Sequence, residues 1–160
     1  MTALDNRGNP TTEVQTDSMT TPTAQARTSS GKGESVRTVG HIDVHKYRCI
    51  TNDITTDEVV ITDERIAHIK TRHPGHYEKI RPFLRAALET PDHILQDKKP
   101  DTALILKRIE PDDLRIQVVL RLHTSADEEN RKNSIISAWK INKSRWDDCR
   151  KNKKILYSRK

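Results

Sequence analysis

The segment LRIQVVLRL, residues 114–122, alternates between strongly apolar and more polar side chains. The apolar row is Leu114, Ile116, Val118, Leu120 and Leu122, and the intervening row is Arg115, Gln117, Val119 and Arg121. This period of two is typical of a strand buried on one side only, which predicts an antiparallel sheet packed against helices. The turn residues 111–113 precede this segment and follow a second apolar run, 102–109, so the two runs predict a hairpin.

The residues before the hairpin predict helices. Thr62 can cap a helix that carries Ile66 and Ile69 and ends at Pro74–Gly75. A second helix is expected over 82–89. Short strands are expected over 46–50, 58–61, 93–96, 134–141 and 154–157, with a last helix over 143–151. The expected architecture is therefore α+β, with helices first and an antiparallel sheet after them.

Residues 1–40 differ in composition from the rest of the chain. They contain thirteen Ser or Thr residues and no aromatic residue. Such a stretch buries too little surface to offset the entropy of ordering it, so a disordered leader or linker is expected, followed by one domain over 41–160. No segment has the pattern of a secretory signal or the length of a membrane span, which favours a cytoplasmic location in the producing or the target cell.

Positive charge is concentrated at the C-terminus. The formal net charge is +6, and residues 131–160 carry 11 basic and 2 acidic residues. Clustered Lys and Arg are typical of a surface that binds a polyanion, and this pattern favours nucleic acid over a membrane surface. The alternative is a solvated face that keeps the protein soluble. The only cysteines, Cys49 and Cys149, form neither a disulfide framework nor a zinc knuckle.

Histidines are frequent around the expected helices. His68 and His73 are suited to general acid–base catalysis near neutral pH, although a lone histidine is more often a surface or a core residue. His68, His73 and His76 lack the spacing of a zinc-binding helix, and the acidic residues of 97–113 form no recognisable magnesium cluster. The interpretation is metal-free chemistry with no cofactor.

Cations and one hydroxyl fall on the expected sheet. By strand alternation Arg121, Ser134 and Lys140 project opposite the apolar rows, and Lys107 is expected with them. Together these groups could hold a phosphodiester and stabilise its added charge in the transition state. The alternative, at equal weight, is that an antiparallel sheet shows charged side chains to water on its open face.

Four segments together resemble the phage-type barnase/EndoU/colicin/RelE-like (BECR-fold) nuclease domain. They are ITDERIAHIKTRHPGHYE, ETPDHILQDKKPDTALILK, LRLHTSADEENRKNSIISAWKI and KNKKILYSRK, in this order. The resemblance runs from about residue 47 to the C-terminus. It implies helices followed by a four-stranded antiparallel sheet, and a metal-independent ribonuclease or ribonuclease toxin. By position it implies site roles for His68, His73, Lys107, Arg121 and Ser134, with Ser137, Trp139, Lys140 and Tyr157 nearby.

The resulting hypothesis is an RNA endonuclease that works by attack of the 2′-hydroxyl on the adjacent phosphorus, giving a cyclic phosphate. His68 or His73 would be the acid–base group, with His73 preferred. Lys107, Arg121 and Lys140 would hold the phosphate, and Ser134 would donate a hydrogen bond to it. Trp146 is expected to stack on RNA, and Trp139 is expected in the core. The basic residues expected to follow the flanking RNA are Lys151, Lys153 and Lys154.

Two other classes of function stay open at this point. The domain could bind nucleic acid without cutting it, or it could be an interaction module of a phage particle. RNA is the expected partner, with tRNA as one candidate, and an immunity or antitoxin protein is a second candidate partner. The joint presence of histidines and a Lys/Arg/Ser sheet face favours cleavage, because binding alone does not need that combination.

Overall fold

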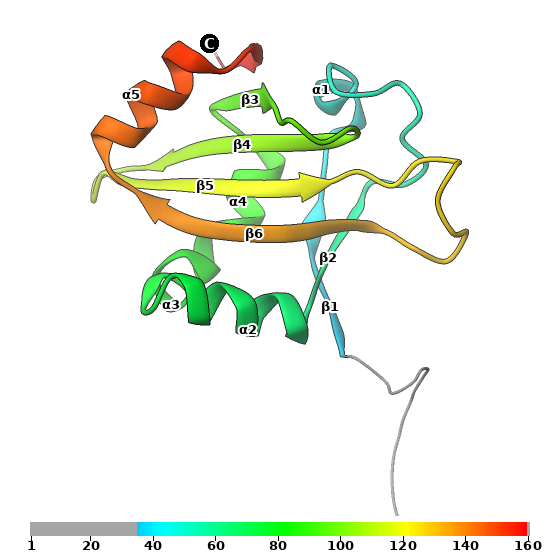
Figure 1. Cartoon of the computed structure of the whole chain (residues 1–160), viewed down its shortest axis with the longest axis horizontal. Coiled ribbons are helices and arrows are strands. Elements are labelled where there is room, and N and C mark those ends of the chain that lie inside the picture. The colour runs from blue at the N-terminus through cyan, green and yellow to red at the C-terminus, as the bar shows by residue number, and fades with distance from the viewer. Residues whose placement is uncertain (1–34, 160) are drawn as a thin grey trace, which may run out of the picture. The chain divides into compact units, whose positions relative to one another are not determined.

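A seven-stranded sheet in the order β1-β2-β6-β5-β4-β3-β7 forms the centre of the fold (Figure 1). The structure is a computed structural model that describes residues 35–159. All neighbouring strands are antiparallel except β2 and β6, which pair in parallel. The strands are β1 Val36–His41, β2 Glu58–Thr62, β3 His93–Gln96, β4 Thr102–Ile109, β5 Leu114–Arg121, β6 Asn133–Ile141 and β7 Ile155–Ser158. The helices are α1 Val44–Tyr47, α2 Asp63–Arg72, α3 His76–Ile80, the 3₁₀ helix η2 Arg81–Phe83, α4 Leu84–Glu89 and α5 Lys143–Asn152.

The prediction of a four-stranded antiparallel sheet that follows N-terminal helices is therefore wrong, although the fold class is α+β. Within residues 35–159 two strands precede α2, and one pair in the sheet is parallel. The sequence did not predict strand β1, because four of its six residues are exposed and buried residues do not alternate with exposed ones along it. It also includes residues 36–40, which the sequence assigned to the leader; residues 1–34 of that leader lie outside the described residues. The strand expected over 46–50 is instead occupied by the end of α1.

The central hairpin forms as the alternation predicted. Strands β4 and β5 pair from Thr102 opposite Arg121 to Ile109 opposite Leu114. Helix α2 begins where the cap was expected, because the Thr62 hydroxyl accepts a hydrogen bond from the Arg65 amide at 3.2 Å. The described residues contain no helix with the length and hydrophobicity needed to span a membrane.

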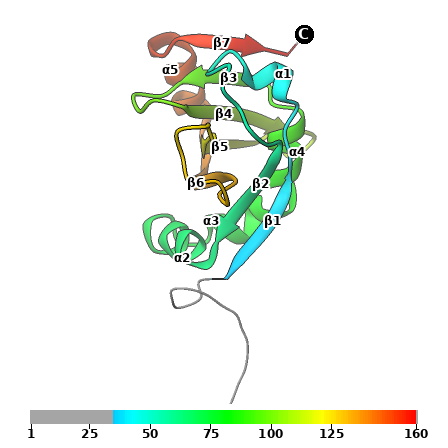
Figure 2. The ribbon, with the colours of Figure 1, turned by 90° about the vertical axis from the view of Figure 1, so that its right-hand side faces the viewer.

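Apolar clusters lie on both faces of this hairpin. Ile105 of β4 and Ile116 and Val118 of β5 belong to the larger cluster, which includes residues of α2, α3 and α4. The second cluster contains Leu95, Leu104, Leu106, Ile141, Trp146 and Cys149, and the last two come from α5. Figure 2 shows α4 on one side of the central strands and α5 on the other. The sheet face that was expected to be open is thus covered at one end by α5.

A β-bulge changes which residues of β6 share a face. Leu120 is opposite Ile135, but the next pair is Val119 opposite Ser137, so Ile136 is an extra residue. One extra residue reverses the alternation of every side chain beyond it. Consequently Ser137 lies on the same face as Arg121, and the prediction that Ser134 and Lys140 share a face is wrong.

Candidate functional site

Arg121 and Ser134 are direct cross-strand neighbours on the sheet face that α5 partly covers. Both line a cavity of about 580 Å³, which Arg65 reaches from α2. The other polar side chains that line this cavity include Thr62, Asp127, Glu128, Asn130, Arg131 and Lys132. Four cations face it against two carboxylates, and three of these cations are in ion pairs with Asp127, Glu128 and Glu58. Within residues 35–159 Arg65 has no ion-pair partner, so the cavity can still attract an anion. The predicted pairing of Arg121 with Ser134 is present, and Arg65 adds a third group that can contact a phosphate.

The Arg121 guanidinium is held in place by its own loop. Its Nη2 donates to Asp127 at 3.0 Å, its Nη1 donates to the Leu122 carbonyl, and Asp101 lies 4.0 Å from Nη1. The Thr124 amide donates to Asp127 at 2.9 Å, and this hydrogen bond is the main cause that lowers the pKa of Asp127. The Asp127 carboxylate therefore stays ionised and orients the guanidinium, whose side chain remains 35% exposed.

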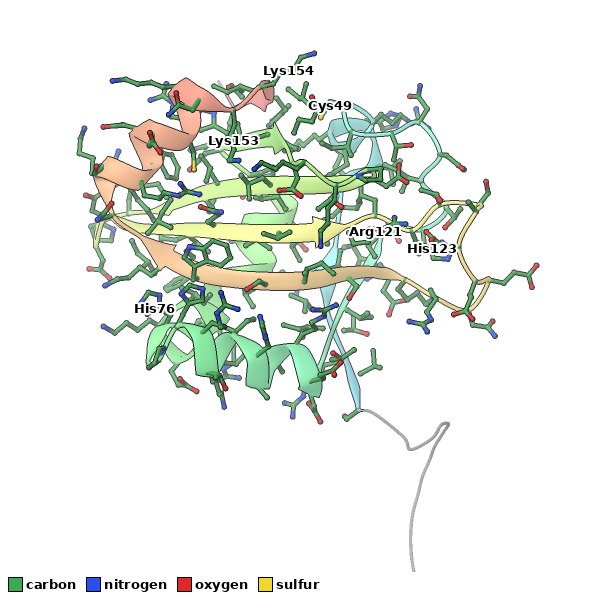
Figure 3. The ribbon with its side chains drawn as sticks, viewed as in Figure 1. Cys49, His76, Arg121, His123, Lys153 and Lys154 are labelled. Carbon is green, nitrogen blue, oxygen red and sulfur yellow. The ribbon has the colours of Figure 1, made fainter. Side chains whose placement is uncertain are left out.

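His123 fixes the loop that carries Asp127. The side chain is buried, with Nδ1 against the Thr55 hydroxyl and Nε2 at 2.6 Å from the Glu128 carbonyl. Its backbone amide donates to the Asn133 side chain at 2.8 Å. Both ring nitrogens are thus used within the protein, as expected of a structural histidine. Figure 3 shows His123 beyond the end of β5, past Arg121.

A histidine pair lies at the other end of β6. The His73 ring stacks on Trp139 with 4.8 Å between ring centroids and 13° between planes. The His76 ring is 5.5 Å from that of His73. Gly75 between them adopts φ = 80°, a left-handed conformation that glycine accepts without strain, and it turns the chain from α2 into α3. The Pro74–Gly75 break thus brings the two imidazoles together.

The histidine pair lies where the edge of β6 is not paired with another of the described strands. Strand β2 pairs with β6 only at Asn133 and Ser134, so the outer edge of β6 beyond them lies next to α2 and α3. At this edge the Lys140 amide donates to His76 Nδ1 at 3.1 Å. A neutral His76 therefore carries its proton on Nε2. This contact satisfies a backbone donor that a further strand would otherwise bind.

The pKa values of His73 and His76 are both lowered, which favours the neutral imidazole. Partial burial is the main cause that lowers the pKa of His73, and the charges of His76, Arg72 and His68 add to it. Partial burial also lowers the pKa of His76, followed by the charges of Lys140 and Lys79. An imidazole that is neutral at pH 7 can accept a proton, so His73 has the protonation state of a general base. The Nδ1 atom of His76 already accepts from the Lys140 amide, so this ring is not available as a base.

The other predicted site residues near β6 lie between or beside the Arg121 cavity and the histidine pair. Ser137 is half-buried and lies on the same side of β6 as Trp139 and Ser134. His68 is exposed on α2, which runs alongside β6 (Figure 1). Trp139 is half-buried against the second apolar cluster and the His73 ring, so it is both a core residue and part of the site.

Lys107 does not belong to this site. It is paired with Ile116 and therefore points to the opposite face of the sheet, where it is 8% exposed. Its Nζ donates to the Thr90 carbonyl at 2.7 Å and lies 3.9 Å from Asp92. The expected position was wrong because Leu104 and Leu106 face α5 rather than the main core. Lys140 is likewise turned away from Arg121, by the bulge in β6.

The C-terminal residues divide into structural and exposed ones. Trp146 is buried in the second apolar cluster, so the expectation that it stacks on RNA is wrong; the helix of α5 turns this ring inward. Tyr157 packs against the larger cluster. Lys151 and Lys154 are exposed and Lys153 is half-buried, so these three remain able to contact a polyanion. Figure 3 labels Lys153 and Lys154.

Sequence reasoning missed three residues of the site. Arg65 is three residues before His68 on α2, a helical spacing that could have joined them. His76 was seen only as part of a histidine-rich stretch. Asp127 lies in a polar loop, where no periodicity relates it to Arg121. Between residues 35 and 159, no group of three or more His, Cys, Asp and Glu side chains is placed to hold a metal ion.

Comparison with known proteins supports the resemblance described above. The sequence model of a family described as phage-Barnase-EndoU-ColicinE5/D-RelE like nuclease2 matches residues 34–158. No curated protein and no solved structure matches the chain. The matched range spans β1 to β7 and therefore includes the Arg121 cavity and the histidine pair. The family is one of nucleases, enzymes that act on nucleic acid. The chain belongs to this phage-type BECR nuclease family.

Proposed function

We propose that this nuclease is an endoribonuclease that cleaves RNA without a metal ion, by attack of the 2′-hydroxyl on the adjacent phosphorus. The observation that supports it most is the placement of His73 on the same sheet face as Arg121 and Ser134, since an acid–base group and a phosphate-binding group are what this reaction needs. RNA supplies the nucleophile itself, so the protein has only to move protons and stabilise charge.

The reacting phosphate would lie over the middle of β6. Ser137 is two residues from Trp139 and three from Ser134 along β6. Because the bulge shortens the second interval, the distance along the strand from Ser137 to each of these residues is roughly 7 Å. A nucleotide placed along the strand would thus have the His73 imidazole on one side of its phosphate. The Arg121 guanidinium and the Ser134 hydroxyl would lie on the other side.

Each group has a distinct role in this proposal. His73 takes the proton of the 2′-hydroxyl while the 2′-oxygen bonds to phosphorus and the bond from phosphorus to the 5′-oxygen breaks. The leaving 5′-oxygen takes a proton from His68, which is exposed on the neighbouring helix α2. Arg121 and Arg65 stabilise the added negative charge, and Ser134 and Ser137 donate hydrogen bonds to phosphate oxygens. The products are a 2′,3′-cyclic phosphate and a 5′-hydroxyl.

Incubation with total RNA, tRNA included, in excess EDTA tests the proposal. We expect cleavage with cyclic phosphate ends, and strong loss of cleavage in His73→Asn and Arg121→Gln. The control is Arg85→Gln on α4, an exposed arginine outside both the cavity and the histidine pair. Cleavage that stops in EDTA and returns with a divalent ion would contradict the metal-free reaction. Salt-dependent binding without cleavage would favour a non-catalytic nucleic-acid-binding domain.

A further inference from the structure

A second cavity, of about 690 Å³, lies at the opposite end of β6 from the Arg121 cavity. It is built from α3, the turn between β4 and β5, the end of β6 and the start of α5. Its lining residues are His76, Lys79, Phe83, Asp112, Asp113, Leu114, Arg115, Lys140, Ile141, Asn142 and Lys143. His76 and Arg121 mark the two ends of the central strands in Figure 3. The His73–Trp139 stack therefore lies between two cavities.

Positive charge predominates in this second cavity. Lys79, Lys140, Lys143 and Arg115 face it, against Asp112 and Asp113. Arg115 is paired with Asp113 at 3.0 Å, and Lys143 is paired with Asp147 at 2.8 Å. Within residues 35–159, Lys79 and Lys140 have no ion-pair partner. Their charges reach His76, because both contribute to lowering the pKa of its imidazole. Two cations are thus available to an incoming anion.

The start of α5 adds to this field. Asn142 caps the helix by accepting a hydrogen bond from the Arg145 amide at 2.8 Å, and Lys143 is the first helical residue. The first turn contains no acidic residue. Acidic side chains are preferred at this position because they offset the partial positive charge of the helix N-terminus, so a lysine there costs stability and attracts anions.

We propose that this second cavity binds a phosphate of single-stranded RNA that flanks the cleavage position, an inference that rests on the proposed ribonuclease function. Lys79 and Lys140 contact the phosphate. The nucleotides between the two cavities lie along β6, beside the His73–Trp139 stack, where an unpaired base can reach an aromatic surface. The bulge in β6 explains the arrangement, because it turns Lys140 from the Arg121 face toward this separate phosphate.

Binding of a non-cleavable oligonucleotide tests the inference independently of catalysis. RNA with 2′-O-methyl groups lacks the nucleophile, so fluorescence anisotropy with a labelled octanucleotide at several salt concentrations measures binding alone. The variant is Lys79→Gln/Lys140→Gln. The matched control is Arg48→Gln/Arg85→Gln, which removes the same charge from two exposed arginines on or next to α1 and on α4, outside both cavities.

We expect the cavity variant to bind more weakly and to show a shallower dependence of log K on log salt, by about 0.7 for the one phosphate whose contacts are lost. A trinucleotide is too short to reach both cavities, so the variant should weaken its binding less than it weakens binding of the octanucleotide. Equal weakening in the control variant, or an unchanged salt slope, would overturn the inference. A changed slope together with no cleavage of unmodified RNA would support this binding site and contradict the proposed catalysis, so the two failures are distinguishable.

Discussion

The imidazole of His73 lies flat on the indole of Trp139, with 4.8 Å between their centroids. His73 is the residue that follows α2, and its backbone is no longer helical, with φ = −133° and ψ = 72°. The ring orientation is therefore set by the stack and by the neighbouring His76 rather than by the helix. Trp139 is itself half-buried against the cluster under α5, so the sheet provides a fixed surface for the imidazole.

Replacing Trp139 should slow cleavage by misplacing His73. An aromatic pair of this kind contributes about 0.5–1.5 kcal/mol beyond its buried area, which corresponds to up to about tenfold in rate. Trp139→Leu should lower kcat by roughly this factor with little change in KM, whereas Trp139→Phe should keep most of the rate because a ring remains. Single-turnover cleavage of RNA measures this. Equal rates in the Leu variant and the wild-type protein would show that the stack does not orient the base.

The pH dependence of cleavage should reflect the lowered pKa of His73. A general base must be neutral, so kcat/KM should fall on the acid side with a midpoint below the ordinary histidine value of about 6.5. His76→Asn removes one of the charges that lower this pKa, and the midpoint should move to higher pH. His45→Asn, at an exposed histidine of α1, is the matched control and should leave the midpoint unchanged. A midpoint above 6.5 in the wild-type protein would contradict His73 as the base.

The same shift predicts the direction of a stability change. Because the pKa of His73 is lower in the folded state than in the unfolded chain, the unfolded chain binds the proton more readily. This histidine therefore reduces the free energy of unfolding as the pH falls below about 6.5, and the effect levels off below the folded-state pKa. Urea unfolding of the wild-type protein and His73→Asn at pH 7.5 and pH 5 measures it, and the variant should lose less stability on acidification.

The hairpin and the first helix could be predicted because their signals are local. Residues 114–122 alternate over a full strand, and Thr62 caps α2 next to two acidic residues that favour its N-terminus. The site needed information that no local pattern carries. The extra residue Ile136 reverses the faces of β6, and only the pairing with β5 reveals it.

Burial on two faces explains the other failures. Leu104 and Ile105 are both buried, because α5 covers one face of β4 and α4 the other, so alternation could not place Lys107. Strand β1 is an edge strand with an exposed pattern, and its Thr and Gly residues resemble the segment before it. Arg65 and Asp127 reach the Arg121 cavity from a helix and a loop, through tertiary packing alone.

Arg121 should be sensitive to loss of its geometry as well as of its charge. Asp127, at 3.0 Å, and the Leu122 carbonyl hold the guanidinium and leave its remaining donors for a phosphate. Arg121→Lys keeps the charge but loses the planar set of donors, and removal of such a preorganised donor typically costs about 10²-fold in kcat. Asp127→Asn should cause a smaller loss, since the arginine remains but is less well oriented. Cleavage assays with circular dichroism as the folding control check both, and a Lys variant with the wild-type rate would remove Arg121 from the site.

Lys107 should stabilise the fold without taking part in cleavage. Its ammonium group bonds to the Thr90 carbonyl and lies close to Asp92, which also accepts from the Arg159 side chain at 2.8 Å, so this buried group joins the end of α4 to the C-terminus. Lys107→Ala leaves a buried acceptor unpaired and should cost roughly 1–3 kcal/mol in the free energy of unfolding. Lys107→Met keeps the packing of the stem and should cost less. Lys98→Ala, at an exposed lysine, is the control and should stay within about 0.5 kcal/mol. Denaturant unfolding measures these differences, and the cleavage rate of the folded fraction should stay unchanged in all three variants. A folded Lys107→Met variant that cannot cleave RNA would place this lysine in the catalytic machinery after all.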